Sequence, residues 1–299
     1  MAVLERGIWY TEKEESDLDR VDTFHCPQLI EPGRYHLYMS LACPFAHRAH
    51  LVMSYLGLER AISVSTVAAR RYDQGWQFDE LYPDPINGCD KLAALYRTSN
   101  PNYSGRVTVP LLWDKKINRI VCNDSAYMAT DFATNWLALA DNPELLVPEA
   151  LKDDIIELNT WLHSKVNAGV YGLGFAKNQA AYNKASESLF AALDSLNLRL
   201  AKSSFLFGDA ITLSDLFLLP TLVRFEAIYE SLFKANQKRL NQFQYLYAYL
   251  ESLMEIDRIR ATVDIAYMKE HYYFSLRNIN PSGIVPAGPE LPWFKSHKD

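Results

Sequence analysis

Cys43 is the residue of this chain whose type and surroundings most clearly suggest chemistry. It stands in Leu41-Ala42-Cys43-Pro44-Phe45-Ala46-His47-Arg48, after a stretch typical of a β-strand and before one typical of a helix. At a helix start, the backbone amides and the helix dipole favour a thiolate over a thiol. The alternative is an ordinary buried cysteine, because unmodified cysteines are among the most buried residues. The local sequence leaves both interpretations open.

The residue three positions after Cys43 decides which thiol chemistry is open to it. A thioredoxin-type redox motif has a second cysteine there, but this chain has Ala46. Cys43 therefore cannot close a local disulfide. A lone thiolate suits mixed disulfides with a small thiol, which a second molecule of that thiol then resolves.

Local patterns predict the strand and the helix that position Cys43. Residues 35–39 are expected as a strand, and apolar residues recur at helical spacing over 45–56 until Gly57 offers a C-terminal stop. Pro44 suits the first helical position, since its missing N–H would have no intrahelical partner.

Composition and charge exclude several classes of partner. The 299 residues are enough for about two domains, and 49% hydrophobic with 22% charged residues is typical of a globular protein. A net charge of -6 gives no electrostatic case for nucleic acid or an anionic membrane. The apolar run at 216–223 is far short of the ~20 residues that span a bilayer.

The cysteine content indicates the compartment. The chain has four cysteines, and their irregular spacing suggests neither a disulfide scaffold nor a zinc site, so no metal is expected. The first residues lack the apolar core of a signal peptide. A reducing cytoplasm fits these features best.

The two halves of the chain have different sequence patterns. Short β-rich segments at 35–39, 62–67, 111–113 and 120–122 predict a small α/β domain. Between them, residues 70–104 are rich in Asp, Pro, Gly and Asn and are expected as a long loop. Trp76 in this loop is either a wall for a ligand or an anchor on the core.

The second half is predicted to be helical from about residue 148, after a linker at 142–148. Three apolar stripes at helical spacing indicate buried helix faces. They are Leu151, Ile155, Leu158, Leu162 and Val166; then Tyr182, Leu189, Leu193, Leu196 and Leu200; then Leu240, Phe243, Tyr247, Leu250 and Met254.

Thr212-Leu213-Ser214-Asp215 has the spacing of a helix capping box. This is a structural device and not a catalytic one. Replacing Asp215 by Ala is expected to cost about 1 kcal/mol of folding stability or somewhat more.

Two further segments have both a structural and a binding interpretation. Val109-Pro110 is a candidate for a cis peptide, which would let the Val109 main chain pair with an extended peptide ligand. Asp124-Ser125 is an ordinary helix N-cap, or it receives the ammonium and carboxylate of a ligand. Taken alone, the cap is the better interpretation.

An ordered set of motifs resembles the glutathionyl-hydroquinone reductases, the Xi class of glutathione transferases. The resemblance covers nearly the whole chain from Glu31 to Pro289, and the segments with Tyr171 and His271-Tyr272-Tyr273 are its most selective parts. The other matching segments are Cys43-Pro44-Phe45-Ala46-His47-Arg48, Gln74-Gly75-Trp76-Gln77-Phe78, Gly105-Arg106-Val107-Thr108-Val109-Pro110 with Trp113-Asp114-Lys115-Lys116, Asn123-Asp124-Ser125, Leu222-Val223-Arg224-Phe225 and Asn280-Pro281-Ser282-Gly283-Ile284-Val285-Pro286.

The resemblance implies a fold and a domain organisation. The fold is an α/β thioredoxin-like N-terminal domain followed by an all-α helical domain, as in glutathione transferases. An N-terminal extension at 1–30 would precede the glutathione-binding domain at 31–141. The helical domain at 148–270 would be followed by a tail at 271–299 near the acceptor pocket. A homodimer is implied as well.

The resemblance also assigns site residues by matching motif. Cys43 would be the nucleophile, and Tyr171 and Tyr272 would face an aromatic acceptor, with Tyr273 as the nearby alternative. Glutathione would be held by Trp76, Arg97, Val109, Asp124 and Ser125, with Arg106 as a second candidate beside Arg97. Asp124 departs from the family, where glutamate is more usual, and Ala126 and Phe274-Ser275-Leu276 depart as well.

The implied reaction is the reduction of a glutathionylated aromatic quinol, with glutathione as co-substrate. Cys43 would take the glutathionyl group as a mixed disulfide, and a second glutathione would release it as oxidised glutathione. Two alternatives stay open. One is an omega-class-like thioltransferase or dehydroascorbate reductase, and the other is a non-catalytic glutathione-binding regulatory protein.

Overall fold

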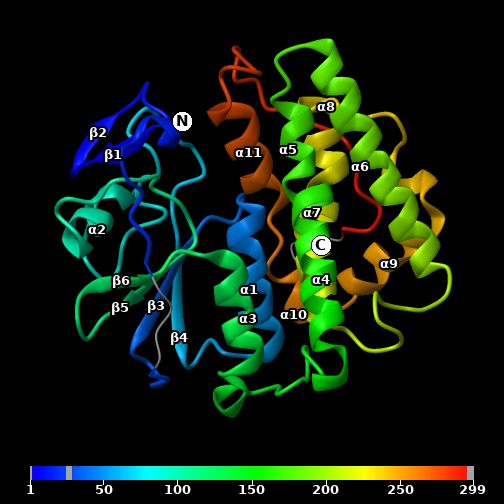
Figure 1. Cartoon of the computed structure of the whole chain (residues 1–299), viewed down its shortest axis with the longest axis horizontal. Helices are drawn as coiled ribbons and strands as arrows, with labels where there is room; N and C mark the ends of the chain where they lie inside the picture. The colour runs from blue at the N-terminus through cyan, green and yellow to red at the C-terminus, as the bar shows by residue number, and fades with distance from the viewer. Residues whose placement is uncertain (1, 25–28, 295–299) are drawn as a thin grey trace. The chain divides into compact units, whose positions relative to one another are not determined.

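The structure is a computed structural model that describes residues 2–24 and 29–294. The chain divides into two compact units, Met1–Pro143 and Glu144–Asp299. A four-stranded sheet lies at the centre of the first unit, and the second is helical (Figure 1). The elements of the first unit are β1 (Val3–Glu5), β2 (Ile8–Tyr10), β3 (Tyr35–Met39), α1 (Pro44–Leu56), β4 (Ile62–Thr66), α2 (Leu92–Ser99), β5 (Leu111–Asp114), β6 (Arg119–Cys122) and α3 (Ser125–Thr134).

The sheet of the first unit has the strand order β4-β3-β5-β6. Strand β3 runs parallel to β4 and antiparallel to β5, and β5 is antiparallel to β6. Every residue of β3 is buried, as expected for a central strand covered on both faces. Figure 1 shows α1 and α3 on one side of the sheet and α2 on the other. The predicted thioredoxin-like fold of this unit is confirmed.

Helix α1 forms as the local sequence predicts. Pro44 is its first residue and Cys43 its N-cap. Gly57 ends the helix in the left-handed conformation, with φ of 70°, and its N–H donates to the carbonyl of Met53, which is the usual role of glycine after a helix. The strand before the helix and the glycine after it therefore fix where Cys43 lies.

The expectation of an uninterrupted loop over 70–104 is wrong, because α2 lies within it. Leu92, Leu95 and Tyr96 are fully buried on the inner side of this helix. The helix has only 8 residues and no side-chain cap at Lys91. It also follows a Pro- and Gly-rich stretch, so neither its start nor its period is visible in the sequence.

The part of the loop before α2 is ordered around the buried carboxylate of Asp84. Its Oδ1 accepts from the Tyr38 hydroxyl at 2.6 Å and from the amides of Ile86 and Asn87 at 3.0 and 3.1 Å, and its Oδ2 accepts from the amide of Cys89 at 3.1 Å. Burial raises the pKa of Asp84, but these hydrogen bonds outweigh burial, so the pKa lies below its ordinary value. The loop is therefore a built structure.

The N-terminal residues expected as an extension contain a β-hairpin. Strands β1 and β2 pair antiparallel, and Leu4 exchanges two backbone hydrogen bonds with Gly105, at 2.9 and 2.8 Å. Val3 and Leu4 are fully buried. The hairpin is thus tied to the segment that leads to Val109.

The second unit consists of helices, two of which continue into π-helical segments. The predicted stripes lie on α4 and its continuation, on α6, and on α9, except that Leu151 precedes α4 and that Leu240 and Phe243 precede α9, which begins only at Gln244. The elements are α4 (Lys152–Leu162) with the π segment His163–Asn167, α5 (Gly169–Gly174), α6 (Gln179–Leu200), α7 (Leu213–Arg224) with the π segment Phe225–Tyr229, α8 (Glu230–Leu232), α9 (Gln244–Met254), α10 (Asp257–Arg260) and α11 (Ile265–Ser275).

The chain after α11 is held by polar contacts within the second unit. The ammonium group of Lys269 donates to the carbonyls of Ala287 and Gly288, both at 2.9 Å. The Trp293 indole N–H donates to Glu226 at 2.7 Å. These bonds fix the tail to α11 and to the π segment after α7.

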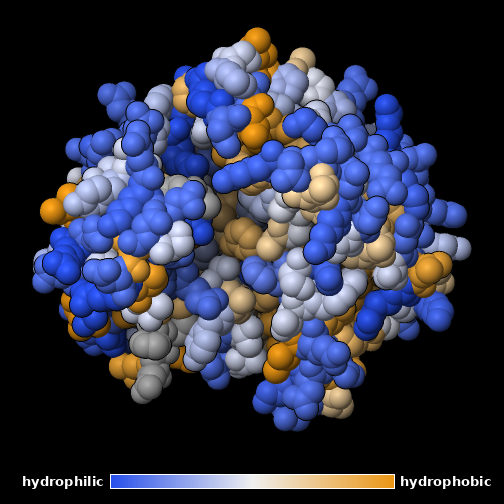
Figure 2. Space-filling model, turned by 45° about the horizontal axis from the view of Figure 1, so that its top comes forward, coloured by the Kyte–Doolittle hydropathy of each residue, from blue (hydrophilic) through white to orange (hydrophobic). Residues whose placement is uncertain are grey.

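The face of the molecule in Figure 2 is mostly hydrophilic, with small separate hydrophobic patches. Exposed apolar side chains such as Leu81, Leu198 and Ile284 come from distant parts of the sequence. In residues 2–24 and 29–294, no helix combines the length and the apolarity that a membrane crossing requires.

Candidate active site

The sulfur of Cys43 lies at the N-terminus of α1, where the sequence predicts it. Its Sγ accepts a hydrogen bond from the backbone N–H of Ala46 at 3.4 Å, and the thiol contacts the carbonyl oxygen of Val109 at 3.7 Å. The side chain is half-buried. An amide N–H directed at the sulfur stabilises negative charge on it, so the position suits a nucleophilic thiolate.

Arg48, which the sequence did not single out, is a buried cation that interacts electrostatically with this sulfur. Arg48 is 2% exposed, and its guanidinium lies 5.1 Å from the centre of the Phe45 ring. Burial lowers the pKa of Arg48 to about 10, while negative charge on Cys43 and Asp124 acts to raise it. The arginine therefore keeps its charge at neutral pH. Nearly all of α1 is buried, so no helical periodicity marked Arg48 as distinct.

The Val109–Pro110 peptide bond is cis, in agreement with the interpretation of this segment. The residue before it is fixed by Tyr96, whose hydroxyl donates to the Thr108 carbonyl at 2.9 Å and accepts from the Thr108 amide at 3.2 Å. Helix α2, hidden in the expected loop, thus holds the segment whose carbonyl meets Cys43.

Asp124 is the N-cap of α3, and Ser125 is the first residue of that helix. The carboxylate of Asp124 accepts from the amides of Ala126 at 2.8 Å and Tyr127 at 3.0 Å. Both bonds go to Oδ1. The cap interpretation is therefore confirmed, and it is compatible with ligand recognition through the other carboxylate oxygen.

Trp76 and Arg97 both have structural contacts in the first unit. Trp76 is 8% exposed, and the Arg71 guanidinium lies 5.4 Å from the centre of its ring. The Nε of Arg97 donates to the carbonyl of Gly7 at 2.8 Å, which ties α2 to the turn of the N-terminal hairpin. This contact joins residues 90 positions apart in the sequence, so no local pattern could predict it.

Two of the predicted acceptor residues meet in the second unit. The hydroxyls of Tyr171 on α5 and Tyr272 on α11 are hydrogen-bonded to each other. A third hydroxyl, that of Tyr229, lies 3.2 Å from that of Tyr272. Burial raises the pKa of Tyr272 far above its ordinary value, although Arg224 and the bond to Tyr171 act to lower it. Tyr272 is therefore a neutral phenol at physiological pH.

Tyr273, the alternative to Tyr272, makes different contacts. Its hydroxyl is hydrogen-bonded to that of Ser231 and donates to the carbonyl of Ala227 at 3.2 Å. The structure thus joins Tyr171 to Tyr272. Tyr229 was missed by sequence reasoning, because it carries no local signal among 18 tyrosines.

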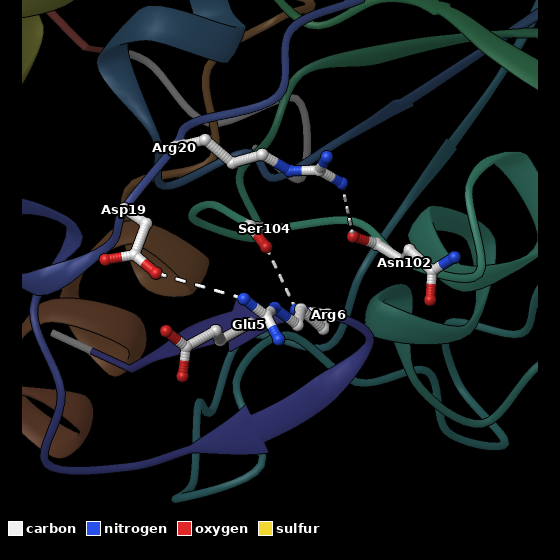
Figure 3. Close-up of a pocket in the computed structure, with 6 residues that line it drawn as sticks. All are labelled: Glu5, Arg6, Asp19, Arg20, Asn102 and Ser104. Atoms are coloured by element: carbon white, nitrogen blue, oxygen red, sulfur yellow. Dashed lines mark hydrogen bonds and ion pairs between the residues drawn. The ribbon is translucent and has the colours of Figure 1, made fainter.

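A pocket in the first unit is lined by none of the predicted site residues (Figure 3). Its volume is about 310 Å³, and its lining includes Arg6, Arg20, Glu5 and Asp19. Arg6 lies 3.9 Å from Asp19, and Arg20 donates to the carbonyl of Asn102 at 3.1 Å. Glu5 forms an ion pair with Lys13 and Arg20 one with Asp22, so each charged side chain of this lining has a partner of opposite charge.

Two cysteines of the described residues, Cys43 and Cys89, are reduced thiols. Cys26 lies outside the described residues. In the part of the chain that the structure describes, no group of three or more His, Cys, Asp or Glu side chains is placed to hold a metal ion.

Comparisons with known proteins identify both units. The family model described as glutathione S-transferase, N-terminal domain, matches residues 42–135, and the one described as glutathione S-transferase, C-terminal domain, matches residues 179–252. The glutathionyl-hydroquinone reductase PcpF of Sphingobium chlorophenolicum is 41% identical over 265 residues, which cover 88% of this chain and 85% of that protein.

Solved structures agree with these matches. A Xi-class glutathione transferase from Natrialba magadii has a TM-score of 0.95 at 35% identity, and the match covers 99% of this chain and 96% of the other. The glutathione-bound structure of YqjG from Escherichia coli K-12 has a TM-score of 0.90 at 36% identity, with 99% and 98% covered. The chain therefore belongs to the glutathionyl-hydroquinone reductases, the Xi class of glutathione transferases.

Proposed function

We propose that this chain uses glutathione to reduce S-glutathionyl hydroquinones to hydroquinones. The observation that carries the proposal is the hydrogen-bonded pair of phenols, Tyr171 and Tyr272, in a chain whose nucleophile is a lone thiol at a helix start. A thiol alone would serve any glutathione mixed disulfide. The paired phenols favour an aromatic acceptor that has to be protonated.

In the first step, the Cys43 thiolate attacks the sulfur of the glutathionyl group. The bond between this sulfur and the aromatic carbon breaks, and the sulfur–sulfur bond of a Cys43–glutathione mixed disulfide forms. The electron pair leaves with the aromatic carbon. A phenol of the Tyr171–Tyr272 pair supplies the proton that this carbon takes up.

In the second step, a second glutathione attacks the mixed disulfide. Oxidised glutathione leaves, and Cys43 returns as a thiolate. The proton lost by the second glutathione replaces the one given up by the phenol. Over the cycle, one carbon–sulfur bond is reduced to a carbon–hydrogen bond, and two glutathione units are oxidised to one disulfide.

The first unit carries the residues that we assign to glutathione. The Val109 main chain would pair with the cysteinyl unit, close to the Cys43 sulfur that its carbonyl contacts. Asp124 and Ser125 would hold the γ-glutamyl end at the start of α3. Trp76 would pack on the tripeptide, and Arg97 would meet the glycyl carboxylate with the guanidinium nitrogens other than Nε.

We also propose that the protein acts as a homodimer in the cytoplasm. The family resemblance implies the dimer, and a lone reactive thiol needs a reducing compartment with ample glutathione. Sedimentation equilibrium tests the dimer, and a single species of 34.2 kDa would contradict it.

The test uses S-glutathionyl-benzohydroquinone with glutathione and follows released hydroquinone by chromatography. Wild type should release hydroquinone and oxidised glutathione in equal amounts, and Cys43→Ser should release neither. Cys89→Ser is the matched control, because Cys89 is the other reduced thiol among the described residues and lies in the loop around Asp84. Equal rates for wild type and Cys43→Ser would overturn the proposal.

The same preparation separates the omega-type alternative. With dehydroascorbate in place of the quinol conjugate, the proposed enzyme should show a much lower kcat/KM than with S-glutathionyl-benzohydroquinone. A higher kcat/KM with dehydroascorbate would favour the alternative. A wild-type protein that binds glutathione but forms no mixed disulfide at Cys43, checked by mass spectrometry, would be a binding protein only.

A further inference from the structure

Three tyrosine hydroxyls form one connected chain inside the second unit. Tyr229 ends the π segment after α7, and its hydroxyl lies 3.2 Å from that of Tyr272 on α11. Tyr272 is in turn hydrogen-bonded to Tyr171 on α5. Tyr229 and Tyr272 are 43 positions apart in the sequence, and Tyr171 and Tyr272 are 101 positions apart. This row of hydroxyls therefore depends on the packing of three separate elements.

Solvent exposure of the side chain increases from Tyr229 through Tyr272 to Tyr171. Tyr229 is fully buried and Tyr272 is 3% exposed, whereas Tyr171 is half-buried. Of the three, Tyr171 is therefore the phenol that a bound aromatic molecule reaches most easily. The other two hydroxyls act on such a molecule through Tyr171, because burial keeps them away from it.

The rings are held by aromatic packing and do not need the hydroxyls for this. Tyr229 stacks on Phe233 with ring centres 5.2 Å apart, and it meets Tyr272 edge-on at 5.8 Å. Phe233 also meets Tyr171 edge-on at 5.3 Å. A Cβ on Gly174 would lie only 2.3 Å from the Phe233 ring, so this glycine admits the ring.

The π segment that ends in Tyr229 is the second unusual feature of this region. A π turn inserts an extra residue into a helix and is often retained where that residue serves a function. Here the turn covers Phe225–Tyr229 and delivers a fully buried phenol to the hydroxyl of another. A regular continuation of α7 would rotate the residues that follow by about 100°.

Either hydroxyl of each pair can be the donor, and the charge that the reaction creates favours one direction. Each neutral phenol has one proton to donate. Tyr229 donating to Tyr272, and Tyr272 donating to Tyr171, directs both protons toward the oxygen of Tyr171. When that oxygen gives its proton to the aromatic carbon, it becomes a phenolate, and a donated hydrogen bond stabilises this charge.

We propose that Tyr229 is a positioning residue of the reductase. It orients the Tyr272 hydroxyl toward Tyr171, and it supports the phenolate that forms there when Tyr171 protonates the leaving aromatic carbon. This inference rests on the proposed function. It assigns the proton donation to Tyr171 and makes Tyr272 and Tyr229 its successive supports.

The test isolates the first step in a single turnover. Excess enzyme is mixed with S-glutathionyl-benzohydroquinone without added glutathione, and hydroquinone release is followed as enzyme concentration is varied. For Tyr229→Phe we expect the maximal rate to fall about tenfold, the size of one neutral hydrogen bond, with half-saturation within twofold of wild type. Tyr249→Phe is the matched control, because it removes a buried phenol hydroxyl of the same unit that bonds to Asp215 and not to these tyrosines, and it should leave both values unchanged.

Two further measurements separate positioning from a merely structural role. Reduction of bis(2-hydroxyethyl) disulfide with glutathione needs Cys43 but protonates no carbon, so Tyr229→Phe should leave its rate unchanged. In a Tyr272→Phe background, adding Tyr229→Phe should cause no further loss, because Tyr229 acts through Tyr272.

The outcomes are distinguishable from failure of the proposed function. If wild type releases no hydroquinone, the proposed function itself fails. If wild type is active and Tyr229→Phe keeps the wild-type rate, this inference alone is overturned. Equal losses with the quinol conjugate and with the simple disulfide, or full additivity with Tyr272→Phe, would also overturn it.

Discussion

Asp215 is a buried carboxylate on which three segments of the second unit converge. It is fully buried and accepts from the amide of Thr212 at 2.7 Å and from its hydroxyl at 2.9 Å. It also accepts from the amide of Leu206 at 3.0 Å and the hydroxyl of Tyr249 at 2.9 Å. The capping box predicted for this helix is confirmed, but the carboxylate does more than cap.

Replacing Asp215 by Ala should therefore cost more than the loss of a cap. The amides of Leu206 and Thr212 would lose their acceptor in the interior, at about 1–3 kcal/mol each. The hydroxyls of Thr212 and Tyr249 can rotate toward other acceptors and add less. Burial raises the pKa of Asp215, which means that keeping its charge in the interior costs free energy. Removing the carboxylate removes this cost and offsets part of the lost stability. We expect Asp215→Ala to lower the free energy of unfolding by about 3–4 kcal/mol, against about 1 kcal/mol for a simple cap.

Urea unfolding at pH 7, followed by circular dichroism at a helix band, measures this loss. Tyr249→Phe is the matched control, since it removes one of the four donors and should cost about 1 kcal/mol. The slope of the free energy against urea should stay the same, so that the shift in midpoint reports stability. A loss of 1 kcal/mol or less for Asp215→Ala, or equal losses for both variants, would refute this reasoning.

Three further changes test other parts of the structure. Gly174→Ala should lower the free energy of unfolding by about 1–3 kcal/mol in a urea titration, because its Cβ would meet the Phe233 ring at 2.3 Å; an unchanged midpoint would contradict this contact. His36 is buried between Ser63 and Ser65, and burial lowers its pKa to about 4, so the unfolded chain binds its proton first as the pH falls. Stability should drop by roughly 3 kcal/mol between pH 7 and pH 4 on account of His36, and His36→Asn should be less sensitive to acid; equal acid sensitivity would count against it. Asp84→Ala should open the loop before α2 to proteolysis, because three backbone amides lose their acceptor; a loop as resistant as that of wild type would show that Asp84 does not hold it.

The parts of the site that depend on neighbouring residues were predictable. Cys43, Pro44 and Gly57 are a cap, a first helical residue and a C-terminal stop, and each acts on backbone groups within four or five positions. The same holds for the cap formed by Asp124. Such signals are written in short segments, so the sequence alone determined where the thiol lies and that no second cysteine follows it.

The parts that depend on packing were decided only by the tertiary structure. Helix α2 was hidden, because its stability comes from burying Leu92, Leu95 and Tyr96 and not from a cap. The burial of Arg48, the bond of Arg97 to the distant hairpin, and the addition of Tyr229 to the pair of phenols have no local signature. The physical reason is that groups 43 to 101 residues apart meet only when whole elements pack, and packing depends on the shape of the entire core.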